Sequence, residues 1–166
     1  IKFSATAESA YRLDDVTLNV GEGGQSVDLA NGSENPGGGE EPAPDTDAYY
    51  FDNFDGKEAT KTYGSGSSWP YIDQFPEFAN AVGSAAGSVT YTGKAVSVRN
   101  NSNSNGTYSD YAGSGLNNIF FGADAYFQVN GIALASDQKN LKLTFGTEKY
   151  SQDNGSKFTP SEFHVL

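Results

Sequence analysis

Apolar and polar residues alternate along much of the chain with a period of two, which is typical of β-strands that have one buried face. Residues 1–20 show the pattern first, and Asp14-Asp15 interrupts it. An acidic pair at such a break predicts either a β-bulge or a position that binds a ligand. The alternating apolar side chains that we expect to face a core are Ile1, Phe3, Tyr11, Leu13, Val16 and Leu18.

The alternation returns in residues 48–166, where loops rich in Gly, Ser and Asn separate the apolar stretches. The run Ile119-Phe120-Phe121 is continuous, as in a strand that is buried on both faces. Many short strands between such turns favour a β-sandwich, and the one predicted helix is short, at residues 76–82. We predict strands at residues 49–54, 88–91, 95–99, 118–121, 125–129, 140–145 and 161–166.

Residues 21–47 interrupt both patterns. Runs of Gly and Pro there disfavour regular structure, and the segment holds seven acidic residues with no Lys or Arg. We therefore predict three parts: a β-strand arm (1–20), an acidic Gly/Pro-rich linker (21–47) and a β-sandwich body (48–166).

Composition narrows the class of protein. The chain has 166 residues, a formal net charge of −11, 36% hydrophobic and 13% aromatic residues, and no cysteine. That aromatic content disfavours full disorder, and no apolar run is long enough for a membrane span. Nucleic acid is an unfavourable partner because phosphate binding depends on clustered Lys and Arg. The lack of cysteine excludes disulfides and thiol chemistry in these residues.

The chain begins at Ile1 without a methionine, and both ends have the pattern of strands. We therefore expect a processed piece of a longer protein, which is secreted or at the cell surface and whose signal peptide has been removed.

Several stretches together resemble one family of β-sandwich domains. They are residues 50–56 with Trp69-Pro70 after them, residues 141–145, and residues 161–165. They are similar to the jelly-roll domains of Bacteroidetes surface proteins of the cleaved-adhesin or choice-of-anchor J type, a branch of the galactose-binding-like sandwiches. The resemblance implies an all-β jelly-roll β-sandwich in an adhesive, exported protein.

The same resemblance assigns a role to the arm. The family's domain continues through further strands and closes on one with an acidic motif, which residues 13–18 resemble although they stand at the start of the chain. The body would then be incomplete at its C-terminus. Residues 1–20 would be the end of a preceding repeat or a closing strand beside residues 49–55, supplied within the chain or to another copy by strand exchange.

Four carboxylates are candidate metal ligands. Asp14, Asp15, Asp52 and Asp55 would approach one another if the first and last strands of the domain pair. Hard oxygen ligands of this kind suit a structural Ca²⁺, which related galactose-binding-like domains often hold. The alternative is that these side chains are solvated or cap turns.

Aromatic residues in or beside the loops are candidate ligand contacts. Flat rings cover the C–H faces of a sugar, while amides and guanidinium groups bind its hydroxyls. The alternative, strongest for Trp69, is that the ring packs into the core. The candidate residues are Trp69, Tyr71, Arg99, Asn100, Tyr108 and Tyr111.

Signals for an enzyme are weak. His164 is the single histidine, and alternation with its apolar neighbours predicts that it faces outward. No nucleophile elbow, zinc-protease motif or phosphate-binding glycine loop is found. We therefore expect a non-catalytic carbohydrate-binding or adhesion module. The alternative is a structural subunit of a tandem-repeat or filament-like assembly, in which copies exchange residues 1–20 as a donor strand.

Overall fold

The computed structural model describes residues 1–6, 10–21, 47–62, 68–101, 115–150 and 158–166. The fold is all-β, and its elements are β1 (Lys2–Ala5), β2 (Ala10–Val20), β3 (Tyr50–Asp52), the 3₁₀ turn η1 (Pro76–Phe78), β4 (Thr90–Asn100), β5 (Asn117–Asn130), β6 (Leu141–Tyr150) and β7 (Phe163–Val165). The predicted fold class is confirmed as far as an all-β, sandwich-like architecture, while the jelly-roll topology stays a prediction. No helix among these residues is long and apolar enough to cross a membrane.

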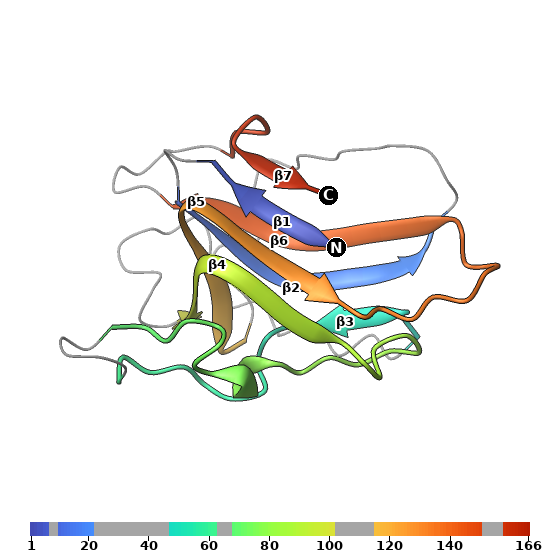
Figure 1. Ribbon diagram of the computed structural model, residues 1–166, viewed down its shortest axis with the longest axis horizontal. Helices are drawn as coiled ribbons and strands as arrows, with labels where there is room; N and C mark the ends of the chain where they lie inside the picture. The colour runs from blue at the N-terminus through green and yellow to red at the C-terminus, as the bar shows by residue number, and fades with distance from the viewer. Residues whose placement is uncertain (7–9, 22–46, 63–67, 102–114, 151–157) are drawn as a thin grey trace.

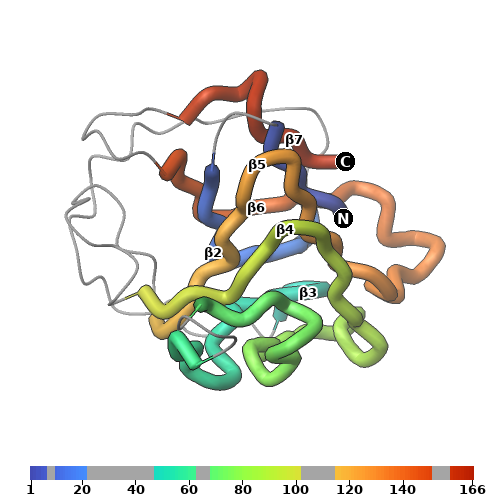
Figure 2. The backbone as a smooth tube through the Cα atoms, turned by 60° about the vertical axis from the view of Figure 1, so that its left-hand side comes forward, coloured from blue at the N-terminus to red at the C-terminus, as the bar shows by residue number. Residues whose placement is uncertain are grey.

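All seven strands belong to one antiparallel sheet, which folds over on itself (Figures 1 and 2). One edge of β5 pairs with β4, and its other edge pairs first with β2 and then with β1. One edge of β2 pairs with β6, and its other edge pairs first with β5 and then with β3. Each of these two long strands therefore changes neighbours halfway, which sets β4, β5 and β1 in front of β2 and β6 in Figure 1.

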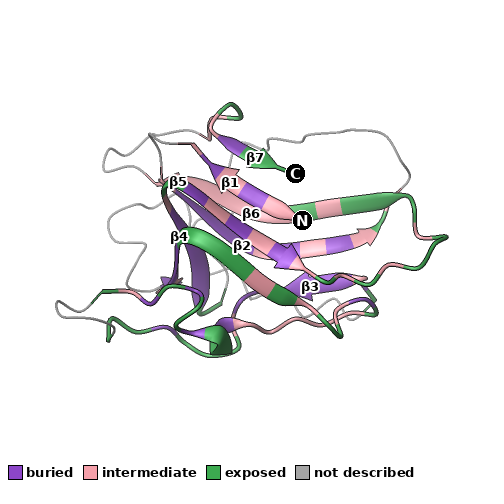
Figure 3. Ribbon diagram, in the orientation of Figure 1, coloured by how far each residue is buried: buried purple, intermediate pink, exposed green. Residues whose placement is uncertain are grey.

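The core lies between these two layers and is rich in aromatic rings. Tyr11, Leu13, Val16 and Leu18 of β2 are all buried in it. Figure 3 shows buried stretches in purple along β3 and β5 as well. The residues of β2 that face the core are odd-numbered before Asp15 and even-numbered after it. The change occurs because Asp15 adopts a φ of 50° and the register with β6 shifts between Asp14 and Thr17. The predicted interruption at Asp14-Asp15 is therefore a β-bulge.

Two predicted pairs of short strands are single long strands in the structure. Residues 88–91 and 95–99 fall largely within β4, and residues 118–121 and 125–129 fall within β5. The register shifts between Lys94 and Val96, and Ala95 and Asp124 have φ values of 55° and 52°. In β4 the bend moves the apolar positions from odd-numbered Tyr91 to even-numbered Val96 and Val98. In β5 the apolar positions stay odd-numbered, and the exposed residues Ala123 and Asp124 interrupt the pattern.

The first and the later parts of the chain share one sheet and one core. Val16, Thr17 and Leu18 of β2 pair with β3, so residues 1–20 lie beside the opening strand of the body within the same chain. Residues 22–46, nearly all of the predicted linker, lie outside the described residues. The predicted helix at 76–82 is shorter than expected, since Ala79 is already extended, and His164 is exposed as predicted.

Candidate functional site

A row of side chains crosses four strands on the face of the sheet opposite the core. Tyr71 forms an isolated bridge with Ser97, Ser97 pairs with Phe120, Phe120 with Arg12, and Arg12 with Glu148. Directly paired residues project to the same face of a sheet. Their strand neighbours Val98, Ile119 and Leu13 point into the core, so this row lies on the opposite face of the sheet. Ser97, Phe120 and Arg12 are buried on that face as well.

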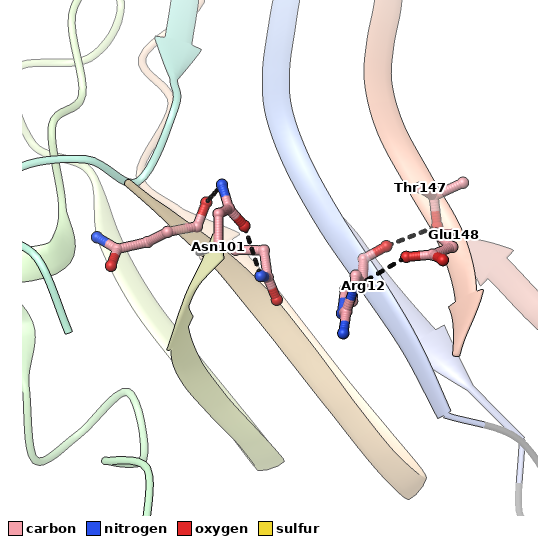
Figure 4. Close-up of polar contacts among 6 residues, drawn as sticks. Arg12, Asn101, Thr147 and Glu148 are labelled. Atoms are coloured by element: carbon pink, nitrogen blue, oxygen red, sulfur yellow. Dashed lines mark hydrogen bonds and ion pairs between the residues drawn. The ribbon is translucent and has the colours of Figure 1, made fainter. Parts of the chain in front are cut away.

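Arg12 is the central charge of the row. Its side chain is fully buried, its Nη1 lies 3.1 Å from Glu148 Oε2, and its guanidinium Cζ lies 5.1 Å from the centre of the Tyr150 ring. Thr147 Oγ1 also donates a hydrogen bond of 2.8 Å to the Arg12 carbonyl (Figure 4). These contacts neutralise Arg12 and hold β2 against β6, because a buried charge is stable when it is paired and hydrogen-bonded.

Arg99 is the second arginine on this face. Its Cζ lies 3.2 Å from the centre of the Phe120 ring, and its Nε donates to Ser97 Oγ at 3.2 Å. Phe120 in turn meets Tyr150 edge-on, with ring centres 5.2 Å apart. Arg12, Arg99, Phe120 and Tyr150 therefore form a single arginine–aromatic cluster.

The electrostatics of Arg99 differ from those of Arg12. Burial, and then the charge of Arg12, lower the pKa of Arg99 to about 10. Tyr150 and Tyr71 are close enough to act in the opposite direction, and no carboxylate of the described residues is among the causes of the shift. The arginine–aromatic cluster thus holds a second positive charge, partly removed from water, that forms no ion pair with a described carboxylate.

A shallow groove of about 520 Å³ runs along the open edge of β4, next to this cluster. The bulge at Ala95 shapes it, and Gly93 keeps it open, because a Cβ there would lie 2.8 Å from Ile72 Cδ1. Tyr71 stands at its border with 53% of its surface exposed, and Tyr71 N donates to Gln74 Oε1 at 3.1 Å. Its lining residues are Tyr71, Ile72, Asp73, Tyr91, Thr92, Gly93, Ala95 and Val96.

The structure brings together two of the six predicted ligand contacts, Tyr71 and Arg99. Trp69 is half-buried and packs against the core, with Lys61 Nζ 5.4 Å from its ring centre. Asn100 is buried and donates to the Glu58 carboxylate. Tyr108 and Tyr111 lie outside the described residues.

Three residues of the arginine–aromatic cluster were missed by sequence reasoning: Arg12, Phe120 and Tyr150. Arg12 sits within an apolar alternation, and Phe120 within a continuous apolar run. Both patterns indicate a strand but say nothing of its neighbours. The register of β2 with β5 and β6 brings these side chains together, and no local signal carries that register.

Three of the four predicted metal ligands converge near the start of β5. Asp14 is fully buried, and burial, followed by the charges of Asp15 and Asp55, raises its pKa well above the ordinary value. Asp15 N donates to Asp14 Oδ1 at 3.0 Å, while Asp14 Oδ2 has no hydrogen-bond partner among the described residues. Asp55 Oδ1 accepts from the backbone N–H groups of Leu116 and Asn117 at 2.9 and 2.8 Å.

Buried amides surround these carboxylates. The Asn101 side chain hydrogen-bonds to Asp14. Asn101 also donates to the Asn117 carbonyl at 3.0 Å and accepts at Oδ1 from Asn118 Nδ2 at 2.7 Å (Figure 4). Within the described ranges, however, no three acidic or histidine side chains are already positioned to hold a metal ion. The fold thus brings the three carboxylates near one another, but their oxygens do not surround a common metal position.

Asp52, the fourth predicted ligand, has other partners. Its Oδ1 accepts from the N–H groups of Phe54 and Asn80 at 2.7 and 3.1 Å, and Tyr91 Oη donates to its Oδ2. Burial raises its pKa to about 6, and these three hydrogen bonds act against that shift. Asp52 therefore fixes the connection after β3 and is not directed at Asp14.

Comparison of the chain with family models, curated proteins and solved structures found no match. The arguments that follow rest on the geometry of the two sites.

Proposed function

We propose that this chain is a non-catalytic carbohydrate-binding or adhesion module of a secreted or cell-surface protein. The observation that carries the proposal is the position of Tyr71, which is 53% exposed between an open groove and the guanidinium of Arg99. An accessible ring beside planar hydrogen-bond donors suits a pyranose, because the ring covers its C–H face while the donors bind its oxygens.

The shape of the groove supports binding of an extended ligand. It follows the open edge of β4, and its lining includes Tyr71, Asp73 and Thr92 as polar contacts. Asp73 is the one carboxylate among the described lining residues. Glycoside hydrolysis usually needs two carboxyl groups that flank the scissile bond, so this groove favours binding over cleavage.

A glycan array and polysaccharide pull-down test the proposal. We expect Tyr71→Ala to weaken binding about tenfold, the loss that corresponds to about 1.4 kcal/mol for a stacked ring. Tyr126→Ala is the matched control, because Tyr126 is a half-buried tyrosine on β5 that does not line the groove. Trp69→Ala, which removes a ring packed on the core, separates loss of folding from loss of contact. An array without binding to well-folded protein would contradict the proposal.

We also propose that Asp14, Asp15 and Asp55 hold a structural Ca²⁺, with Asp52 outside the site. Support comes from Asp14, whose buried Oδ2 has no hydrogen-bond partner in the described part of the chain. Carboxylate and amide oxygens are ligands that Ca²⁺ prefers, and a bound cation would offset the repulsion among the three carboxylates. The ion would stabilise the fold at the start of β5 and takes no part in chemistry.

A further inference from the structure

Arg12 and Arg99 lie on the same face of the sheet but differ in their described charge partners. Arg12 is paired with Glu148 at 3.1 Å, whereas Arg99 has no carboxylate among the causes that shift its pKa. Its hydrogen bond in the described structure runs from Nε to Ser97 Oγ. An anion placed beside Arg99 would therefore supply the missing counter-charge in a partly water-excluded position.

The orientation of Arg99 is also fixed. Its guanidinium lies over the Phe120 ring with Cζ 3.2 Å from the ring centre, and the Nε–Ser97 hydrogen bond sets the rotation of its plane. This leaves the two Nη groups as a planar pair of donors. A guanidinium held in this way matches the two oxygens of a carboxylate, and little side-chain entropy remains to be lost on binding.

We propose that the ligand is a carboxylated sugar, of the uronic or sialic acid class, whose carboxylate binds Arg99 while its ring packs on Tyr71; this inference rests on the proposed carbohydrate-binding function. Tyr71 pairs with Ser97, two residues before Arg99 on β4. That separation is about 7 Å along a strand, a distance that one pyranose and its exocyclic carboxylate can span.

The overall charge of the protein makes the interaction specific. A net charge of −11 repels anions at long range, so an acidic glycan gains nothing from nonspecific attraction. Binding of such a glycan therefore depends on a local contact, and Arg99 provides one.

The test is an array that carries neutral glycans, uronate- and sialic-acid-terminated glycans, sulfated glycans, and methyl esters of the carboxylated ones. We expect the free acids to bind at least tenfold more tightly than their methyl esters, since a charge-assisted bidentate contact is lost in the ester. Arg99→Gln should remove this preference, and Arg99→Lys, which keeps the charge without the planar fork, should retain part of it.

Lys94→Gln is the control for net charge, because Lys94 is an exposed lysine on the same strand, paired with Asp124. It should leave the preference for acid over ester unchanged. If Arg99→Gln does not fold, two measurements on the wild-type protein still test the role of Arg99. One is the comparison of acid and ester binding, and the other is the change in the ¹⁵N shift of Arg99 Nε on titration with the best-binding free acid.

The outcomes separate the two proposals. Binding to neutral or sulfated glycans alone, or equal binding of acid and ester, overturns the role of Arg99 while carbohydrate binding stands. Binding to no glycan at all overturns the proposed function, and this inference with it.

Discussion

Val16 of β2 lies directly opposite Asp52 of β3 in an antiparallel pair, so the start of the chain and the opening of the body are neighbouring strands of one molecule. The same β2 also pairs with β5 and along its length with β6. It is therefore a central strand of the sheet.

Leu13→Ala is expected to destabilise the fold strongly. Leu13 is fully buried in the core, and truncation of such a side chain costs about 2–5 kcal/mol through lost contacts and the cavity that remains. Val20→Ala, on the same strand but with Val20 63% exposed, should change the free energy of unfolding by less than about 0.5 kcal/mol. Urea denaturation followed by tryptophan fluorescence measures the free energy of unfolding of both variants. A loss for Leu13→Ala as small as that for Val20→Ala would show that Leu13 is not in the core.

Deletion of residues 1–20 is expected to prevent folding of the remainder. It would expose the edges of β5 and β6 that pair with β2. It would also remove six buried core side chains: Phe3, Ala5, Tyr11, Leu13, Val16 and Leu18. Circular dichroism and light scattering should find an unfolded or aggregated product. A truncated body that stays folded, and takes up a peptide of residues 1–20, would instead favour assembly by strand exchange.

Asp52→Asn is expected to weaken the dependence of stability on pH. Asp52 has a pKa of about 6 in the fold, above the ordinary 3.8, so the folded state binds the proton more tightly. The stability from this proton is present below about pH 4 and is lost as the pH rises through 6, a change of about 3 kcal/mol. The variant should therefore be more stable than wild type above pH 6, because its amide oxygen still accepts from Phe54 and Asn80 N–H and its NH₂ can donate to Tyr91 Oη.

Urea titrations from pH 4 to 7.5 check this, with Asp137→Asn as the control at an exposed carboxylate. Parallel pH profiles for wild type and Asp52→Asn would contradict the role of Asp52.

Calcium is expected to raise the melting temperature of the wild-type protein and to have much less effect on Asp14→Asn. Without the ion, the pKa of Asp14 is raised well above its ordinary value by burial and by Asp15 and Asp55, so its charged form destabilises the fold near neutral pH. Asp14→Asn should then be the more stable protein in EDTA. A concentration of Ca²⁺ about 100 times its Kd should stabilise wild type by about 2.7 kcal/mol. Thermal melts in EDTA and Ca²⁺ measure this, and identical wild-type melts would remove the calcium proposal.

The sequence allowed the strands to be predicted better than the sites. Asp14-Asp15 interrupts an otherwise regular alternation, and such a break indicates a bulge without any knowledge of the neighbouring strand. Ala95 bends β4 in the same way, but there the break was interpreted as a gap between two strands. The alternation of apolar residues indicates where a strand bends. Whether the strand continues past the bend depends on its pairing with the neighbouring strand.

The arginine–aromatic cluster shows the other limit. Arg99 and Tyr71 were candidates because of their residue types, whereas Arg12 and Phe120 joined them through the registers of β2, β5 and β4. The Asp52 side chain likewise binds Tyr91, which belongs to another strand and was no part of the predicted site. Contacts between distant segments depend on register, and a single sequence gives no direct measure of it.

Gly83→Ala is expected to be destabilising, because this glycine holds the chain against the start of β3. Gly83 has a φ of +119°, and an added Cβ would lie 2.6 Å from the Tyr49 carbonyl oxygen. Next to it, Val82 and Phe51 exchange backbone hydrogen bonds of 2.9 Å. The strained φ and the backbone clash together should cost about 1–3 kcal/mol.

Gly87→Ala is the matched control, because a Cβ at Gly87 meets nothing within 4 Å. Its free energy of unfolding should stay within about 0.5 kcal/mol of wild type. Since Val82 bridges the same β3 strand that pairs with β2, the loss in Gly83→Ala should also make the amide protons of Phe51 and Leu18 exchange faster. Equal stability of the two alanine variants would mean that the segment after Val82 does not pack on β3 as it does here.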